Sequence, residues 1–223
     1  MLCLLVAGLL QAAPDMPVRQ PVLDSEGRFW VYRNGLVHPP MPFLPYAWMS
    51  DVTNNMSKLI SIDLECVDHP NEMPATTRAS ETQCCLRTKI TWGDATWASI
   101  AFISGPDKPP WWGENNRGRH YDLSGLAKKK LVFFTRGEHG GEAIKVQIGV
   151  LGGKPYGDSL PQPFISDEMT LTQEWVRHEI DLKSIPGSEL EHICNGFGVI
   201  VERSSQSGSP DETVFYLDDI YYE

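Results

Sequence analysis

Helical patterns, positive charge and metal-ligand motifs are all scarce in this chain of 223 residues. Lysine and arginine together number 19 against 29 aspartate and glutamate residues, and the formal net charge of −10 repels phosphate backbones, which argues against nucleic acid as a partner. There is no Cys-x-x-Cys pair and the six histidines are scattered, so a structural zinc site has no support. Gly-x-Ser-x-Gly, His-Glu-x-x-His and Walker motifs are absent as well.

Residues 1–13 form the one long apolar run at the start of the chain, and it is too short to span a bilayer. The run ends in small residues and is followed at once by Pro14 and Asp15, which is typical of a secretory signal. We therefore expect a secreted, periplasmic or cell-surface protein. The alternative is a buried N-terminal strand or helix.

Removal of this segment would take Cys3 with it and leave four cysteines in an exported chain, which permits disulfides. Cys84 and Cys85 are neighbours, and neighbours in a strand point to opposite faces, so at most one of them suits a given partner. We expect a disulfide between Cys66 and Cys85, with Cys66–Cys84 as the alternative.

Apolar residues alternate with polar ones in many short segments that are separated by turn residues, which predicts an all-β domain. An Asn34-Gly35 turn after residues 29–32 indicates a hairpin. Without strand–helix alternation, these segments predict one antiparallel β-sandwich or jelly roll. The further expected strands are 59–64, 85–92, 97–103, 131–135, 143–150, 175–182, 197–202 and 214–222.

Alternation within two expected strands also predicts a second, polar surface. If one face of each strand is core, the other face carries Phe134, Arg136, Lys145 and Gln147. An aromatic ring beside hydrogen-bonding side chains is a common way to hold sugars, because the ring stacks on C–H groups while polar atoms contact hydroxyls. An ordinary amphipathic sheet explains the same pattern.

A loop rich in proline and glycine carries two adjacent tryptophans, Trp111 and Trp112. Large exposed rings are unfavourable unless they bind something, so this loop is a candidate for ligand contact. Tyr156, between Pro155 and Gly157, is a similar case. The rings of the tryptophan pair could instead plug one end of the sandwich.

Two adjacent carboxylates, Asp218 and Asp219, lie inside a run of strand-forming residues near the C-terminus. Burying a charge is costly unless it is paired or bound to a metal, so these residues are candidates to hold a calcium ion. First and last strands are often neighbours in a jelly roll, and Asp51 is the expected partner carboxylate. The alternative is that these side chains simply face water.

Several motifs together resemble the galactose-binding-like, β-jelly-roll carbohydrate-binding modules of secreted bacterial proteins, which often stand beside glycoside hydrolases. The resemblance covers roughly residues 43–223. It implies a non-catalytic module with a structural calcium and a sugar site on the concave sheet or its loops, and it places family aromatic positions at Trp97 and Trp112 and an Arg-Gly element at Arg136. The motifs are FLPYAWMSD (43–51), YDLSG (121–125), LVFFTRG (131–137) with GGE (140–142), WVRHEIDL (175–182) and FYLDDIYYE (215–223).

We accordingly divide the chain into a signal-like segment (1–13), an N-terminal extension with a hairpin (14–42) and a jelly-roll domain (43–223). The expected function is polysaccharide or oligosaccharide binding by a monomer without catalysis. Two alternatives stay open: a jelly-roll glycoside hydrolase or polysaccharide lyase, and a cell-surface interaction domain. A close pair of carboxylates in a deep groove would favour the hydrolase, since a retaining glycosidase needs two such groups.

Overall fold

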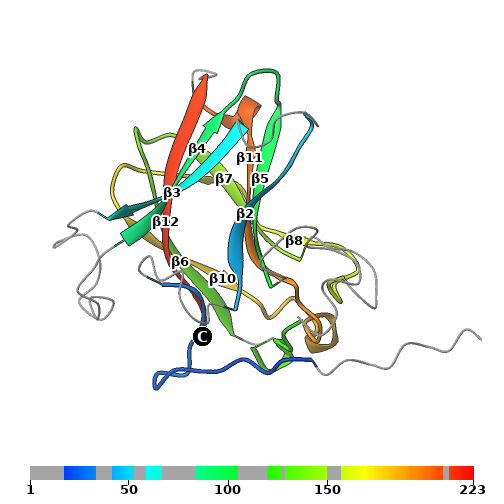
Figure 1. Ribbon diagram of the computed structural model, residues 1–223. Coiled ribbons are helices and arrows are strands. Elements are labelled where there is room, and N and C mark those ends of the chain that lie inside the picture. Colours follow the sequence, from blue (N-terminus) through cyan, green and yellow to red (C-terminus); the bar gives the residue numbers. More distant parts are fainter. Residues whose placement is uncertain are drawn as a thin grey trace, which may run out of the picture.

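The structure is a computed structural model, and it describes residues 18–33, 42–52, 59–66, 84–104, 120–126, 129–149, 157–207 and 211–223. Two antiparallel sheets pack face to face in this part of the chain (Figure 1). In the described residues, three short 3₁₀ helices lie between strands: η2 (Ser124–Leu126), η3 (Gly187–Glu189) and η4 (Arg203–Ser205). Among the described residues, no helix has the length and apolar character needed to cross a membrane.

One sheet has β12 at its centre, and we call it the β12 sheet. Its strand order is β10-β6-β12-β4-β3. Because β12 is long, β4 pairs with its first half and β1 pairs with its last residues. The strands are β1 (Phe29–Tyr32), β3 (Ile60–Cys66), β4 (Cys84–Thr91), β6 (Lys130–Gly137), β10 (Val176–Asp181) and β12 (Glu212–Tyr222).

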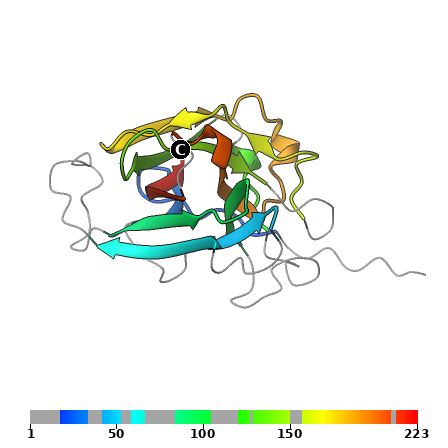
Figure 2. The same ribbon diagram turned by 90° about the horizontal axis from the view of Figure 1, so that it is seen from above.

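The other sheet has β11 at its centre, and we call it the β11 sheet. Its order is β2-β5-β11-β7-β8, and β9 also pairs with β7. In Figure 2, β12 (red) and β11 (brown-orange) face each other across the sandwich. The strands are β2 (Leu44–Ser50), β5 (Trp97–Ile103), β7 (Ala143–Ile148), β8 (Phe164–Ile165), β9 (Met169–Thr170) and β11 (Asn195–Glu202).

The core between the sheets is built from the alternate residues of each strand. Phe102 packs edge-on against Phe197 at 5.3 Å within the β11 sheet, and Phe133 of the β12 sheet meets Phe197 at 5.4 Å. All three rings are fully buried, and a buried phenylalanine stabilises a fold by about 1.5–3 kcal/mol. The Tyr222 hydroxyl also donates a hydrogen bond to the carbonyl of Gly196, which ties the last strand to the opposite sheet.

The predicted all-β sandwich is confirmed, and most predicted strands match the observed ones within two residues. The sequence did not reveal the two-residue strands β8 and β9, nor β2, which contains Pro45. Proline cannot donate to the ladder and is tolerated at a sheet edge, where β2 lies. The predicted Asn34-Gly35 hairpin turn lies outside the described residues.

The segment before residue 43 contributes a strand to the sandwich. Phe29 pairs with Tyr222 and Trp30 with Tyr221, so β1 lies beside the C-terminal end of β12. Arg19 also forms a bridge with Tyr121. The jelly roll therefore begins on the N-terminal side of the expected boundary at residue 43.

Candidate functional site

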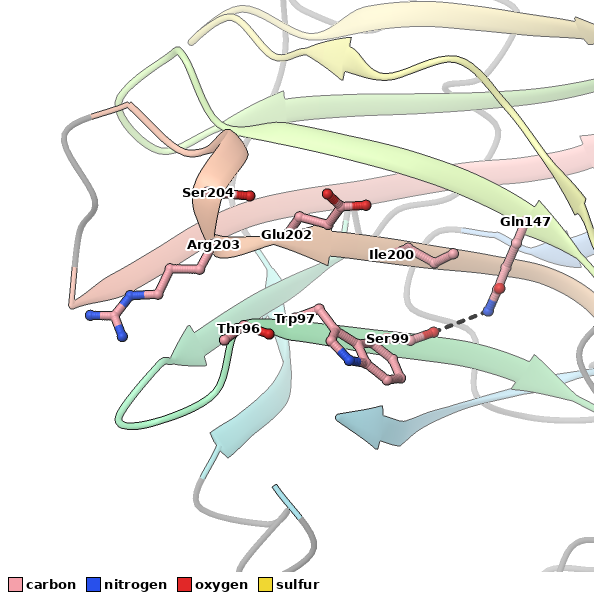
Figure 3. Close-up of a pocket in the computed structure, with 8 residues that line it drawn as sticks. All are labelled: Thr96, Trp97, Ser99, Gln147, Ile200, Glu202, Arg203 and Ser204. Atoms are coloured by element: carbon pink, nitrogen blue, oxygen red, sulfur yellow. Dashed lines mark hydrogen bonds between the residues drawn. The ribbon is translucent and has the colours of Figure 1, made fainter. Parts of the chain in front are cut away.

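A cavity of about 650 Å³ opens on the outer face of the β11 sheet. We call it the β11 groove. Figure 3 shows its side chains projecting from β5, β7 and the end of β11. Its lining residues are Thr96, Trp97, Ser99, Gln147, Ile200, Glu202, Arg203 and Ser204.

Strand alternation in β5 places Trp97 and Ser99 in the groove. Ala98, Ile100 and Phe102 point into the core, so the residues between them face outward. Trp97 is partly exposed and pairs with Glu202 of β11. A partly exposed indole beside a carboxylate offers both an apolar face and a hydrogen-bond acceptor to a ligand.

The floor of the groove is a hydrogen-bonded amide. The Gln147 Nε2 atom donates to the Ser99 Oγ atom at 3.0 Å, across β11 (Figure 3). Both residues are buried, and this bond offsets the penalty of removing an amide and a hydroxyl from water. Ile200 lies opposite Ser99 in the ladder and adds apolar surface.

One wall of the groove is formed by an ion pair. Lys145 Nζ lies 2.6 Å from Glu202 Oε1, and this hydrogen bond holds the pKa of Lys145 above its ordinary value. Arg203 donates from Nη1 to the Gly93 carbonyl at 2.8 Å, which anchors the wall to the β4–β5 turn. The opposite charges of Lys145 and Glu202 compensate each other, and Arg203 adds a positive charge to this wall.

The structure brings three of the residues predicted from the sequence to this site. Trp97 and Gln147 line the groove, and Lys145 is joined to it through Glu202. Their role in ligand binding stays a prediction. Trp111, Trp112 and Tyr156 lie outside the described residues.

The predicted surface that combined Phe134 and Arg136 with Lys145 and Gln147 is wrong. Phe134 and Arg136 belong to β6 in the β12 sheet, whereas the other two residues belong to β7 in the β11 sheet. The chain passes from one sheet to the other in the short connection between β6 and β7. These two strands therefore do not form a hairpin, and their outer faces point away from each other.

Arg136 instead belongs to an aromatic cluster on the outer face of the β12 sheet. Its guanidinium lies 4.0 Å from the ring centre of Tyr216 and 5.8 Å from that of Trp175. Phe134 is buried in the same cluster, with only 3 % of its surface exposed. Stacking on buried rings gives Arg136 a structural role.

Sequence reasoning missed the contribution of β11 to the groove. Ile200 and Glu202 alternate with the core residues Val199 and Val201, so the period of two already places them on the outer face. Nothing in the sequence indicates that this strand pairs with both β5 and β7. The other lining residues missed were Thr96, Ser99, Arg203 and Ser204.

The carboxylates predicted to hold calcium do not lie in one site. Asp51 follows β2, whose Ser50 pairs with Ala98 at the start of β5. The start of β12 lies at the same end of the sandwich, because Glu212 pairs with Thr91 and the β4–β5 turn is short. Asp219 lies seven residues after Glu212 along β12. At roughly 3.3 Å per residue, Asp219 is therefore about 23 Å from Glu212 and from that end of the sandwich.

Each carboxylate also has other neighbours. Asp51 is exposed and accepts hydrogen bonds from the Thr96 backbone N–H at 3.0 Å and from its hydroxyl, which hold the pKa of Asp51 below its ordinary value. Asp218 accepts a bond from the Asp219 N–H at 2.8 Å, and Asp219 lies in the field of Arg33 and Arg28. Among the described residues, no group of three or more His, Cys, Asp or Glu side chains is arranged to hold a metal. The three residues thus do not fit the expected calcium site, while calcium elsewhere in the chain stays a prediction.

The predicted Cys66–Cys85 disulfide is corrected by the β3–β4 register. Cys85 lies opposite Glu65, whereas Cys66 lies opposite Cys84. Cys85 is a buried thiol in the cluster on the outer face of the β12 sheet, and Cys194 is a second buried thiol. Burial and the nearby charge of Asp158 raise the pKa of Cys194.

A two-sheet β-sandwich with a tryptophan-lined groove on one sheet is compatible with a carbohydrate-binding module. The model of the family "Carbohydrate binding domain 30" matches residues 69–223, which is more than half of the chain. The chain belongs to this family.

Several solved structures are similar to this chain at low sequence identity. The family 30 module of the cellulosomal cellulase Cel9D-Cel44B of Clostridium thermocellum is 14 % identical, with a TM-score of 0.46 over 88 % of this chain and 96 % of that one. A second family 30 module is 12 % identical, with a TM-score of 0.49 over 87 % and 86 %. An exo-β-agarase is 10 % identical, with a TM-score of 0.50 over 87 % of this chain and 25 % of that one. The comparison with curated protein sequences finds no match.

Proposed function

We propose that the β11 groove binds a polysaccharide chain and that the protein performs no catalysis of its own. The observation that carries the proposal is the position of Trp97 in a groove whose lining combines apolar surface with hydrogen-bonding side chains. The indole is placed to stack on a sugar ring, while the Gln147 amide and the Glu202 carboxylate supply hydrogen-bonding groups for hydroxyls. Family membership supports the same ligand class.

The presence of a single carboxylate among the described residues that line the groove supports a binding role over hydrolysis. Of the described residues that line it, Glu202 alone carries a carboxylate, and that group is paired with Lys145. A retaining or inverting glycosidase uses two carboxyl groups across the scissile bond. We therefore expect no release of reducing sugar when the purified protein is incubated with any polysaccharide that it binds.

Affinity electrophoresis through gels that contain a β-1,3-1,4-glucan, a β-1,4-galactan or a β-1,4-xylan tests binding. On a polysaccharide that retards the parent, Trp97→Ala should weaken binding by about 1–3 kcal/mol, as expected for loss of an aromatic anchor. Trp30→Ala is the matched control, because Trp30 is a partly exposed tryptophan on the other sheet. Equal retardation of the parent and Trp97→Ala would place the site on another surface.

Secretion is part of the same proposal. A chain that binds extracellular polysaccharide needs export, and residues 1–13 have the composition of a signal segment. Expression of the full chain in a bacterial host with mass analysis of the exported protein should show loss of the first 13 residues or nearly so. A full-length chain retained in the cytoplasm would contradict it.

A further inference from the structure

A glycine lies directly beneath the side chain of Gln147, one of the residues that line the groove. Gly198 of β11 lies between Ala101 of β5 and Gln147 of β7 in the ladder. A Cβ atom at this position would lie 2.8 Å from Gln147 Cγ and 3.0 Å from its Nε2 atom. It would also lie 2.9 Å from the Ile100 carbonyl oxygen. The space that a side chain would take at position 198 is thus filled by the side chain of Gln147.

This arrangement explains how Gln147 reaches Ser99. The two residues belong to strands that are not neighbours, since β11 separates β7 from β5. The Gln147 side chain crosses β11 over Gly198, and its Nε2 atom meets Ser99 Oγ at 3.0 Å. In Figure 3 the side chain spans this strand, with its amide group at the Ser99 end. Any larger residue at position 198 would lift the amide away from the floor.

We infer that Gly198 is a positioning residue that sets the orientation of the Gln147 amide for ligand binding. This inference rests on the proposed function of the groove. A glutamine amide carries two N–H donors and a carbonyl acceptor, and the bond to Ser99 uses one donor. The second N–H and the carbonyl of Gln147 are the groups that meet sugar hydroxyls. Their direction is set by the hydrogen bond to Ser99 and by the absence of a Cβ atom on Gly198 beneath the side chain.

A double-mutant cycle on the full chain tests the inference. Gly198→Ala, Gln147→Ala and the double variant are titrated with the polysaccharide that retards the parent. Gly198→Ala should raise the Kd about three- to tenfold in the parent, as for loss of a hydrogen bond, and should have no further effect in the Gln147→Ala background. Equal losses in both backgrounds would overturn it, because the glycine would then act independently of the amide.

Two further variants separate positioning from folding. Gly125→Ala is the matched control, because a Cβ there meets nothing within 4 Å, and it should bind like the parent. Ser99→Ala releases the same amide without adding atoms. It should reproduce the loss of affinity and shift the side-chain amide signals of Gln147 in ¹⁵N–¹H spectra, and it decides the question if Gly198→Ala does not fold. Parent-like affinity together with unshifted amide signals in Ser99→Ala would overturn the inference.

Trp97→Ala separates the positioning role of Gly198 from the binding function of the groove. If Trp97→Ala abolishes retardation while Gly198→Ala and Ser99→Ala bind like the parent, the groove is the site and the positioning role is wrong. If all three variants bind like the parent, the β11 groove is not the binding site.

Discussion

Asp219 has the most unusual environment of any described carboxylate. Its backbone is left-handed, with φ of 43°, at the irregularity where the pairing of β12 with β6 shifts between Asp218 and Tyr221. The side chain is fully buried, and neither carboxylate oxygen has a hydrogen-bond partner among the residues that the structure describes. Burial raises the pKa of Asp219 to about 7, against the opposing effect of the Arg33 and Arg28 charges. Such a carboxylate is a candidate to make stability depend on pH.

The sign of this dependence follows from proton linkage. Between the ordinary pKa of 3.8 and about 7, the folded state holds the proton on Asp219 more tightly than the unfolded state does. The stabilisation that Asp219 gives the folded state is therefore present at low pH and is lost as the pH rises through about 7. One pKa unit corresponds to about 1.4 kcal/mol. The free energy of unfolding of Asp219→Asn minus that of the parent should therefore be about 2–4 kcal/mol larger at pH 8 than at pH 4.

Urea unfolding of both proteins across this pH range measures the effect. Asparagine tolerates a left-handed backbone, so the substitution leaves the local geometry in place. Asp181→Asn, at an exposed carboxylate, is the control and should not show the same gain at high pH. A stability difference between Asp219→Asn and the parent that stays constant with pH would show that Asp219 is not protonated preferentially in the folded state.

At the scale of elements, the β3–β4 pair makes a prediction about a disulfide. Cys66 and Cys84 lie directly opposite each other, and opposite Cα atoms in antiparallel strands are about 4.5–5.5 Å apart, within the range of a disulfide. We expect Cys66–Cys84 to form in the exported protein. Closing a loop of roughly 20 residues should stabilise the fold by about 3 kcal/mol.

Peptide mapping without reduction should recover residues 66 and 84 in one linked fragment, with Cys85 and Cys194 alkylated after denaturation. Cys66→Ser and Cys84→Ser should lower the free energy of unfolding equally, and the double variant should lower it no further. Alkylation of all four thiols in the unreduced, exported protein would refute the bridge.

At the scale of the whole molecule, the sheet edges argue for a monomer. The outward side chains of the edge strand β10 are Arg177, Glu179 and Asp181, while β8 and β9 are only two residues long. Charges and short strands at an edge oppose pairing with a second copy, and Pro45 does the same in β2. The net charge of −10 adds repulsion between copies.

Size-exclusion chromatography with light scattering should give a mass close to or, after signal cleavage, slightly below 25.0 kDa. The mass should not change between low and high salt. Salt screens the repulsion between charged copies, but the edge strands still oppose association. A stable dimer under both conditions would contradict this argument.

The period of two in the sequence was sufficient to predict most of the strands, though not β2, β8 and β9. It identifies Ile144, Val146 and Ile148 as one face of β7, and the structure places them in the core. This success has a local cause, because successive side chains of a strand point to opposite faces whatever its partners are. For the same reason, Lys145 and Gln147 could be assigned to an outer surface. Trp97 was predicted as a ligand-binding residue from the family resemblance instead.

The tertiary structure decided which strands share a sheet, and with that the composition of the groove. β6 and β7 are consecutive in the chain but lie in different sheets, and the first and last described strands pair with each other. Sheet membership depends on contacts between residues far apart in the chain, which a local pattern does not encode. Gly198 shows this most clearly. In the sequence it only interrupts a run of strand-forming residues, and its missing side chain matters to the groove because Gln147 of another strand lies across it.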